Sequence, residues 1–131
     1  MTVNEMVSSA TAPMASVQTS DYGGVPVAVV SGELDMTTVD SIGTALFELV
    51  DAHPKGLVVY LAVTFMASSG ISMVLELYGQ SQRDRYAIVF VTSGLAASRP
   101  LKLSGLDQVL PLADTVDDAV NTLRQQRASS R

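Results

Sequence analysis

Residues 57–63 read Leu-Val-Val-Tyr-Leu-Ala-Val, and this run of seven apolar residues decides the fold class. A strand that is apolar along its whole length is typical of the centre of a parallel sheet covered on both faces. Parallel neighbours need crossover connections, which are usually helices. The run is much shorter than the about 20 residues that a membrane-spanning helix requires. We therefore expect an α/β protein built around this strand and no contact with a membrane.

Strand and helix patterns alternate on both sides of the central run. The predicted strands span residues 16–21, 25–31, 57–63, 86–92 and 108–112. The predicted helices begin at Thr37 or Thr38, at Ser68, after Gly94 (with an interruption at Pro100), and at Asp114 or Thr115. A turn at 21–24 joins the first two strands into a hairpin. The order is therefore β-β-α-β-α-β-α-β-α, a mixed, mostly parallel sheet with an antiparallel edge strand and covering helices.

Length and composition favour one compact domain. The chain has 131 residues, with 13 acidic and 8 basic side chains and a net charge of −5. This balance argues against direct binding to nucleic acid. The absence of cysteine excludes disulfides and thiolate sites and is compatible with the cytoplasm. We expect a mobile leader at 1–14, the domain at 15–127 and a frayed tail at 128–131.

The sequence offers no assembled catalytic or metal site. Its single histidine, His53, lies beside Pro54 in a predicted turn, and glycine-rich phosphate loops are absent. The segment 68–70 has no partner histidine, so nucleophilic catalysis is not expected. We expect a protein that is not an enzyme and holds no metal or cofactor.

Two serines that follow the central strand are the most informative polar residues. Ser68 and Ser69 open the next helix, and they have two interpretations. A serine at the N-cap accepts a hydrogen bond from a free backbone N–H, which contributes about 1 kcal/mol. Alternatively, one serine is phosphorylated, since a helix N-terminus favours a phosphate. Its charge of about −1.5 to −2 could then expel a bound partner.

The segment 31–35, Ser-Gly-Glu-Leu-Asp, lies at a second strand end. It is either a polar loop or a recognition loop, and carboxyl ends of parallel strands gather at one edge of a sheet. Met36 and Met66 flank the two segments, as core residues or as an adaptable contact surface. The segment 95–106 is another possible contact element.

These residues together resemble a known family. Gly32-Glu33-Leu34-Asp35 after a strand, followed by Phe65-Met66-Ala67-Ser68-Ser69-Gly70, resembles the anti-sigma factor antagonists, which are single STAS domains of bacteria. The resemblance extends from about residue 16 to residue 125 and includes the segment 103–106. It implies a STAS-like fold and a regulator of transcription that binds an anti-sigma factor and so frees a sigma factor. In the family that partner is often a serine kinase, which phosphorylates the antagonist and ends the binding, and a serine phosphatase resets the switch.

Carried onto this chain, the resemblance implies that Ser68 is the phosphorylation site. The other partner-binding residues that it implies are Glu33, Asp35, Met36, Ala67, Ser69 and Gly70. Residues 1–65 hold seven acidic side chains and one basic one, so Glu33, Asp35 and Asp40 are expected to cluster near Ser68. Such a surface should prefer a basic partner.

The chain departs from the family pattern at three places. Ala67 stands where the family has an aspartate before the phosphorylated serine, and Tyr60 stands where it commonly has aspartate or asparagine. The link 62–66 is one residue shorter. The missing carboxylate at 67 could have assisted proton transfer from Ser68. Two hypotheses follow: an antagonist switched by phosphorylation of Ser68, or a constitutive STAS interaction module. A small-molecule or nucleotide binder is a third hypothesis, which no glycine-rich phosphate loop supports.

Overall fold

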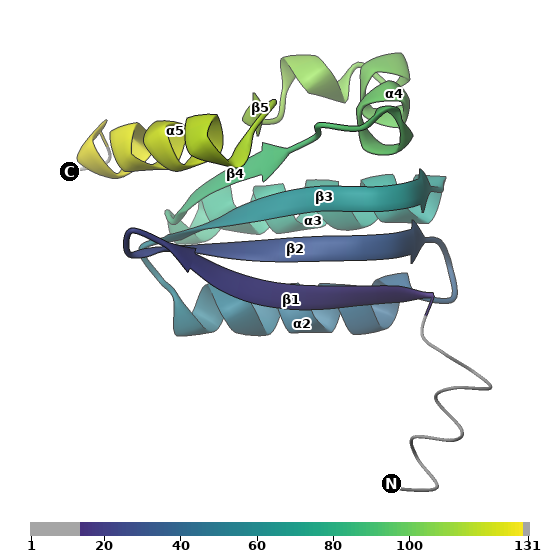
Figure 1. Ribbon diagram of the computed structural model, residues 1–131, viewed down its shortest axis with the longest axis horizontal. Coiled ribbons are helices and arrows are strands. Elements are labelled where there is room, and N and C mark those ends of the chain that lie inside the picture. Colours follow the sequence, from purple (N-terminus) through teal and green to yellow (C-terminus); the bar gives the residue numbers. More distant parts are fainter. Residues whose placement is uncertain (1–13, 130–131) are drawn as a thin grey trace, which may run out of the picture.

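A computed structural model describes residues 14–129, so the leader predicted at 1–14 lies outside the described residues except for Met14. The last two residues of the predicted tail also lie outside them. The structure contains a five-stranded sheet in the order β1-β2-β3-β4-β5 (Figure 1). The strands are β1 Ala15–Tyr22, β2 Val25–Leu34, β3 Gly56–Met66, β4 Ala87–Val91 and β5 Leu112–Ala113. β1 is antiparallel to β2, and the other neighbours are parallel, as the sequence predicts.

The described residues also contain four α-helices and one short 3-10 helix, of which all but the last helix connect strands. They are α2 Val39–Ala52, α3 Ser68–Asp84, α4 Leu95–Leu103, η1 Leu106–Gln108 and α5 Val116–Ser129. The predicted order of strands and helices is therefore confirmed, with η1 in addition. None of these helices is long and apolar enough to cross a membrane.

The helices cover both faces of the sheet, but unequally. Leu46 of α2, Leu77 of α3 and Leu101 of α4 belong to one core, on one face. Val58 of β3 packs with Leu123 of α5 in a second core on the other face. In Figure 1, α2 and α3 lie behind the strands. Right-handed crossovers between successive parallel strands place their helices on the same face, which explains why only α5 lies opposite.

Both strands that lead to the candidate site are longer than predicted. β2 continues to Leu34 through the segment 32–34, which was expected to be a loop. β3 continues to Met66 through the segment 64–66, which was expected to be a link. Backbone pairing persists after the apolar pattern has ended, since Glu33 pairs with Phe65 beyond a register shift. Several of these positions carry polar or exposed side chains, so the sequence pattern did not predict that the two strands continue.

The capping interpretation of the two serines is wrong. The N-cap of α3 is Ala67, in an extended conformation (φ −84°, ψ 174°) and with no side-chain capping bond. Ser68 and Ser69 are instead the first two residues of the helix. Because β3 reaches Met66, the chain enters α3 one residue earlier than a serine cap would require.

Threonines at the starts of α2 and α5 behave differently from each other. Thr38 is the N-cap of α2, as one of the two predicted candidates, but its hydroxyl donates to the carbonyl oxygen of Glu33 (2.7 Å) and caps no helical N–H. Thr115 does cap α5, because its hydroxyl accepts a bond from the N–H of Asp118 (3.1 Å). The hydroxyl of Thr38 thus bonds to the backbone of β2 and not to the first turn of α2.

The region between α4 and β5 also differs from the prediction. α4 continues through Pro100, which forgoes one helical bond without interrupting the helix. The strand predicted at 108–112 is reduced to Leu112–Ala113. The N–H of Leu110 donates to the carbonyl of Leu106 (2.9 Å), and this helical type of bond keeps the segment before β5 in a turn.

Candidate functional site: a surface at the carboxyl edge of the sheet

The candidate site lies where β2 and β3 end beside the start of α3 (Figure 1). The N–H of Ala67 donates to the carbonyl of Leu34 (2.8 Å), so the two strands remain joined up to the residue before Ser68. Ser68 is exposed and begins α3 directly, with no intervening loop. The position of this serine is therefore fixed by the sheet and by the helix together.

Within the described residues, the N-terminus of α3 has no side-chain cap and no acidic residue in its first turn. The methyl group of Ala67 cannot accept a hydrogen bond. The first N–H groups of a helix are unpaired within the helix and carry a partial positive charge. A phosphate on Ser68 would therefore be stabilised where it is attached.

Gly70 and Ser69 lie beneath this surface. A Cβ atom on Gly70 would lie 2.9 Å from Cβ of Leu34 and 3.1 Å from Cγ of Met66, so only glycine lets α3 approach the strand ends this closely. The hydroxyl oxygen of Ser69 is buried and has no hydrogen-bond partner within the described part of the chain. Gly70 therefore positions Ser68 and does not face solvent.

A tight turn after β2 holds Asp35 beside the start of α3. One carboxylate oxygen of Asp35 accepts bonds from the hydroxyl (2.6 Å) and the N–H (2.9 Å) of Thr37. These bonds keep the pKa of Asp35 below its ordinary value of 3.8, so the group is charged at neutral pH. The buried Thr38 hydroxyl joins the turn to the strand, because it bonds to Glu33 and also accepts from the N–H of Asp35 (3.1 Å).

Exposed apolar side chains flank Ser68. Met36, at the tip of the turn, is 83% exposed. Phe65, at the end of β3, lines an apolar groove of about 400 Å³ against α4, together with Leu95 and Leu103. We call this the α4 groove. The sequence indicated the segment 95–106 as a contact element but missed Phe65, although an aromatic residue just before the serine motif was a usable signal.

A second groove, between α2 and α3, carries negative charge. It has a volume of about 280 Å³, and Asp40 from α2 and Glu76 from α3 both line it together with Ser69. Of the three acidic residues expected to cluster near Ser68, Asp40 lines this groove beside Ser69, and Glu33 and Asp35 do not line it. The sequence reasoning missed Glu76, which lies about two turns along α3 from Ser68.

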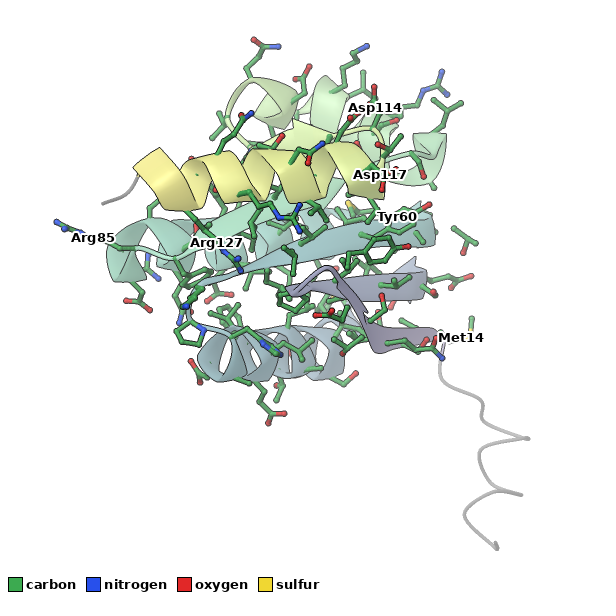
Figure 2. All side chains as sticks on the ribbon, turned by 60° about the vertical axis from the view of Figure 1, so that its left-hand side comes forward. Met14, Tyr60, Arg85, Asp114, Asp117 and Arg127 are labelled. Carbon is green, nitrogen blue, oxygen red and sulfur yellow. The ribbon has the colours of Figure 1, made fainter. Side chains whose placement is uncertain are left out.

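Tyr60 lies away from this surface. It packs with the core on the α5 face of the sheet, whereas Ser68 belongs to a helix on the other face (Figure 2). Its hydroxyl oxygen is 2.7 Å from the hydroxyl oxygen of Ser93, which provides the partner that a half-buried tyrosine needs. The tyrosine therefore does not enter the surroundings of Ser68.

The fold and the serine at the start of α3 define a class of protein. The chain belongs to the STAS domain family, whose model matches residues 16–119. It is 33% identical over 115 residues to the anti-sigma-F factor antagonist RsfB of Mycobacterium tuberculosis, which covers 86% of this chain and 92% of that protein. The family expected from the sequence is therefore confirmed.

Solved structures agree with this assignment. The crystal structure of an anti-sigma factor antagonist from Mycobacterium paratuberculosis has 34% sequence identity and a TM-score of 0.77, and covers 86% of this chain and 97% of its own. The anti-sigma factor antagonist SpoIIAA in its unphosphorylated form has 19% identity and a TM-score of 0.64, over 84% of this chain and 97% of its own. At that identity SpoIIAA shows a shared fold alone.

Proposed function

We propose that this chain is an anti-sigma factor antagonist, a binding protein that engages an anti-sigma factor and thereby releases a sigma factor for transcription. The observation that carries the proposal is the exposed Ser68 at the rigid junction of β3 and α3, in a chain one third identical to a named antagonist. Because it acts on transcription, the protein works in the cytoplasm.

The proposed binding surface surrounds Ser68. It comprises the Asp35 turn with Met36 at its tip, Phe65, and the α4 groove. Exposed apolar side chains beside polar ones are typical of interaction sites. Glu33, Ala67, Ser69 and Gly70 support this surface from the strand ends and the first turn of α3.

Phosphorylation of Ser68 by the kinase activity of the anti-sigma factor is the proposed switch, and a serine phosphatase would reverse it. A phosphate would add about −1.5 to −2 charge beside Asp35, among the exposed apolar side chains of the surface. A partner that covers the surface would have to remove this charge from water, and its binding would end. Ala67 supports the alternative, a constitutive interaction module, because no carboxylate precedes the serine to assist phosphotransfer.

Binding measurements with the cognate anti-sigma factor test the proposal. We expect the wild type and Ser68→Ala to bind, and Ser68→Asp to bind at least tenfold more weakly, because a charge among the apolar contact side chains must lose its water when the partner covers it. Ser20→Asp, on the exposed strand β1, makes the same change far from the surface and should bind like the wild type. Failure of the wild type to bind any anti-sigma factor of the source cell would refute the antagonist function.

Mass mapping after incubation with the kinase and ATP separates the two hypotheses. Phosphate on Ser68 supports the switch. Absence of phosphate, together with wild-type binding and signalling by Ser68→Ala, supports the constitutive module.

A further inference from the structure

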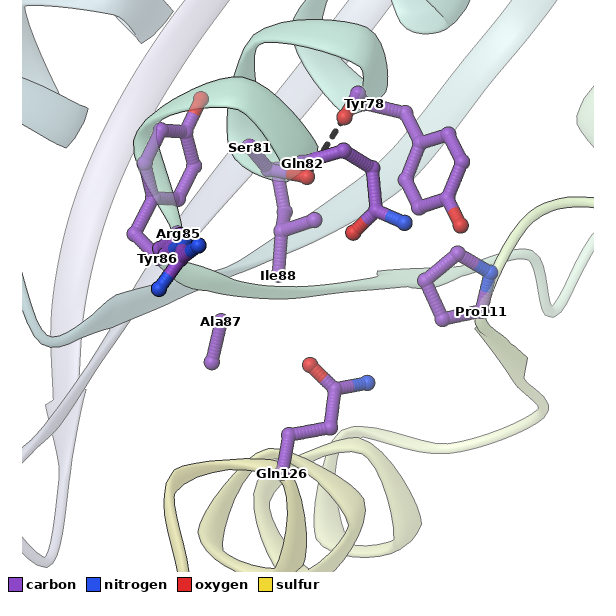
Figure 3. A pocket seen from close by; sticks show the side chains of 9 residues that line it. All are labelled: Tyr78, Ser81, Gln82, Arg85, Tyr86, Ala87, Ile88, Pro111 and Gln126. Atoms are coloured by element: carbon purple, nitrogen blue, oxygen red, sulfur yellow. Dashed lines mark hydrogen bonds between the residues drawn. The ribbon is translucent and has the colours of Figure 1, made fainter. Parts of the chain in front are cut away.

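A separate cavity lies at the end of α3 that is remote from Ser68. Its volume is about 480 Å³, within the range of about 300–1,000 Å³ typical of small-molecule sites. The end of α3, the start of β4, the segment before β5 and the end of α5 form its walls (Figure 3). Ser81, in the cavity wall, is thirteen residues from Ser68 along α3, which corresponds to about 20 Å. The cavity is therefore independent of the partner surface.

The shortness of β5 creates this cavity. β5 pairs only with Phe90 and Val91, so the first half of β4 has no neighbouring strand on this side. The N–H of Phe90 donates to the carbonyl of Pro111 (2.9 Å). Since backbone groups alternate in direction along a strand, the N–H and C=O of Ile88 point the same way, toward the cavity. The cavity therefore lies beside an edge of β4 that no strand pairs with.

Two of the polar side chains in the wall are already engaged. The hydroxyl of Ser81 donates to the carbonyl of Tyr78 (2.6 Å), as the dashed line in Figure 3 shows. The buried hydroxyl of Tyr86 donates to the carbonyl of Leu77 (3.3 Å). Burial raises the pKa of Tyr86 to about 12, so this group stays neutral. Neither hydroxyl is available as the main contact of a ligand.

Three other polar side chains are available. Gln82 of α3 and Gln126 of α5 approach the cavity from opposite sides (Figure 3), and no hydrogen bond of their side chains occurs within residues 14–129. Arg85 is the one charged residue among the described residues that line the cavity, and no carboxylate lines it. This set favours an anion that also has hydrogen-bonding groups.

Arg85 has an unusual backbone conformation. Its φ of 61° lies in the left-handed region, and it is the sole non-glycine residue with a positive φ in the described part of the chain. Helices commonly end in this conformation, but with glycine. Strain of this kind, about 1 kcal/mol or more for a residue with a Cβ atom, is concentrated at functional sites. The left-handed conformation places Arg85 at the rim of the cavity. Figure 2 shows Arg85 at the end of the molecule opposite Met14.

The remaining walls are apolar and flat. The rings of Tyr78 and Pro111 lie next to each other along one side of the cavity, while Ala87 and Ile88 line the adjoining wall (Figure 3). The aromatic ring of Tyr78 favours stacking with another planar group, and the saturated ring of Pro111 adds apolar contact area.

We propose that this cavity binds a small planar aromatic carboxylate whose ring carries amide-like hydrogen-bonding groups. The ring stacks against Tyr78 and Pro111, and the carboxylate pairs with Arg85. The hydrogen-bonding edge of the ring meets the Gln82 and Gln126 amides. This site is additional to the antagonist function and does not depend on it.

A titration of the isotope-labelled full chain, followed by NMR, tests the proposal with orotate as the probe. We expect saturable shifts of the backbone amides of residues 78–88, 112 and 126, and none at Ser68 or in the Asp35 turn. Uracil lacks the carboxylate, and benzoate lacks the amide-like edge. Each should bind at least tenfold more weakly than orotate. Shifts that do not saturate, that lie elsewhere, or that are equal for the three compounds would overturn the proposal.

A pair of arginine variants tests the role of charge at the rim. Arg85→Asn removes the charge and keeps a residue that tolerates a positive φ, and we expect about tenfold weaker binding of orotate. Arg83→Asn removes a neighbouring charge that does not line the cavity, and should bind like the wild type. The spectrum of each variant without ligand verifies its fold. Equal weakening by both variants would mean that only general charge attracts the probe, and would contradict the assigned site.

Discussion

At the scale of single residues, the low pKa of Asp35 depends on hydrogen bonds from Thr37. The hydroxyl and the N–H of Thr37 both donate to its carboxylate. Thr37→Val removes the hydroxyl donor, and we expect the pKa of Asp35 to rise toward 3.8. A carboxyl NMR titration measures this change, with Thr19→Val on exposed β1 as the control. An unchanged pKa would mean that the hydroxyl bond is absent in solution.

The lowered pKa of Asp35 also predicts how the stability of the fold changes with pH. The pKa of Asp35 is lower in the folded chain than in the unfolded chain, whose value is close to 3.8. The carboxylate therefore stabilises the fold fully above the unfolded pKa, and this contribution is lost as pH falls through the folded pKa. Thr37→Val should show a smaller loss of stability over that acidic interval than the wild type.

Gly70 is expected to be intolerant of even a methyl group. Gly70→Ala would bring Cβ to 2.9 Å from Cβ of Leu34, and we expect a destabilisation of about 1–3 kcal/mol from overpacking. Gly43→Ala is a matched control inside α2, because its Cβ would meet only Met73, at an ordinary distance of 3.6 Å. That change should stabilise the chain by about 0.5–1 kcal/mol through helix propensity. Urea denaturation measures both, and equal effects would contradict the close approach at Gly70.

Substitutions of Ala67 can separate two effects of the aspartate that the family has at this position. These effects are the capping of α3 and the assistance of proton transfer from Ser68. Ala67→Asp and Ala67→Asn should each cap α3 and stabilise the chain by about 1 kcal/mol. If a carboxylate assists proton transfer, Ala67→Asp alone should also accelerate phosphorylation of Ser68, by about a hundredfold or more. Thermal unfolding and the rate of phosphate incorporation measure the two effects. Equal rates for both variants would show that capping, not the carboxylate, governs the reaction.

At the scale of elements, α4 should contribute to binding through its outward side chains. Leu103 is 81% exposed, so Leu103→Ser should leave the free energy of unfolding almost unchanged. We expect it to weaken binding of the anti-sigma factor by about tenfold, because it removes apolar area from the α4 groove. Val109→Ser also replaces an exposed aliphatic residue, 52% exposed but outside the groove, and should bind normally. Titration calorimetry distinguishes the two. Equal affinities would exclude the groove from the interface.

The elements also show how far the sequence could predict the structure. The apolar run of β3 indicated burial on both faces, and Leu57, Val58 and Val59 are indeed completely buried. Apolar periodicity reports burial and not backbone pairing, so it missed the strand continuation to Met66. Hydroxyl positions were predicted less well, because a side chain such as Thr38 selects among several nearby acceptors that only the folded chain brings together. The sequence predicted that Ser68 opens a helix, and it is the first residue of α3, whereas the positions of Phe65, Glu76 and the remote cavity depend on tertiary packing.

At the scale of the whole molecule, part of the negative charge of the chain is concentrated in one groove. Acidic side chains from α2 and α3 line one groove beside the proposed binding surface. We expect binding of the anti-sigma factor to weaken as salt is raised, since screening reduces attraction between exposed charges. Asp40→Asn combined with Glu76→Gln should reduce this salt dependence.

Asp51→Asn provides the control for that measurement. Asp51 is also exposed and lies on α2, but eleven residues from Asp40, near the end of the helix. Its substitution should leave the salt dependence nearly unchanged. Association rates measured from 50 to 500 mM salt give the comparison, and equal slopes for all variants would show that the acidic groove does not attract the partner.

The direct junction of β3 with α3 has a consequence for how this chain can be altered. Each added residue turns a helix by about 100° and advances it by about 1.5 Å. Only Ala67, the N-cap, lies between Met66 and Ser68, so an added residue there would not be absorbed by a loop and would rotate all of α3 against the sheet. Its apolar side would then leave the core, and its serine would point in a new direction. In this chain, an exchanged residue between Met66 and Ser68 should therefore be tolerated better than an added one.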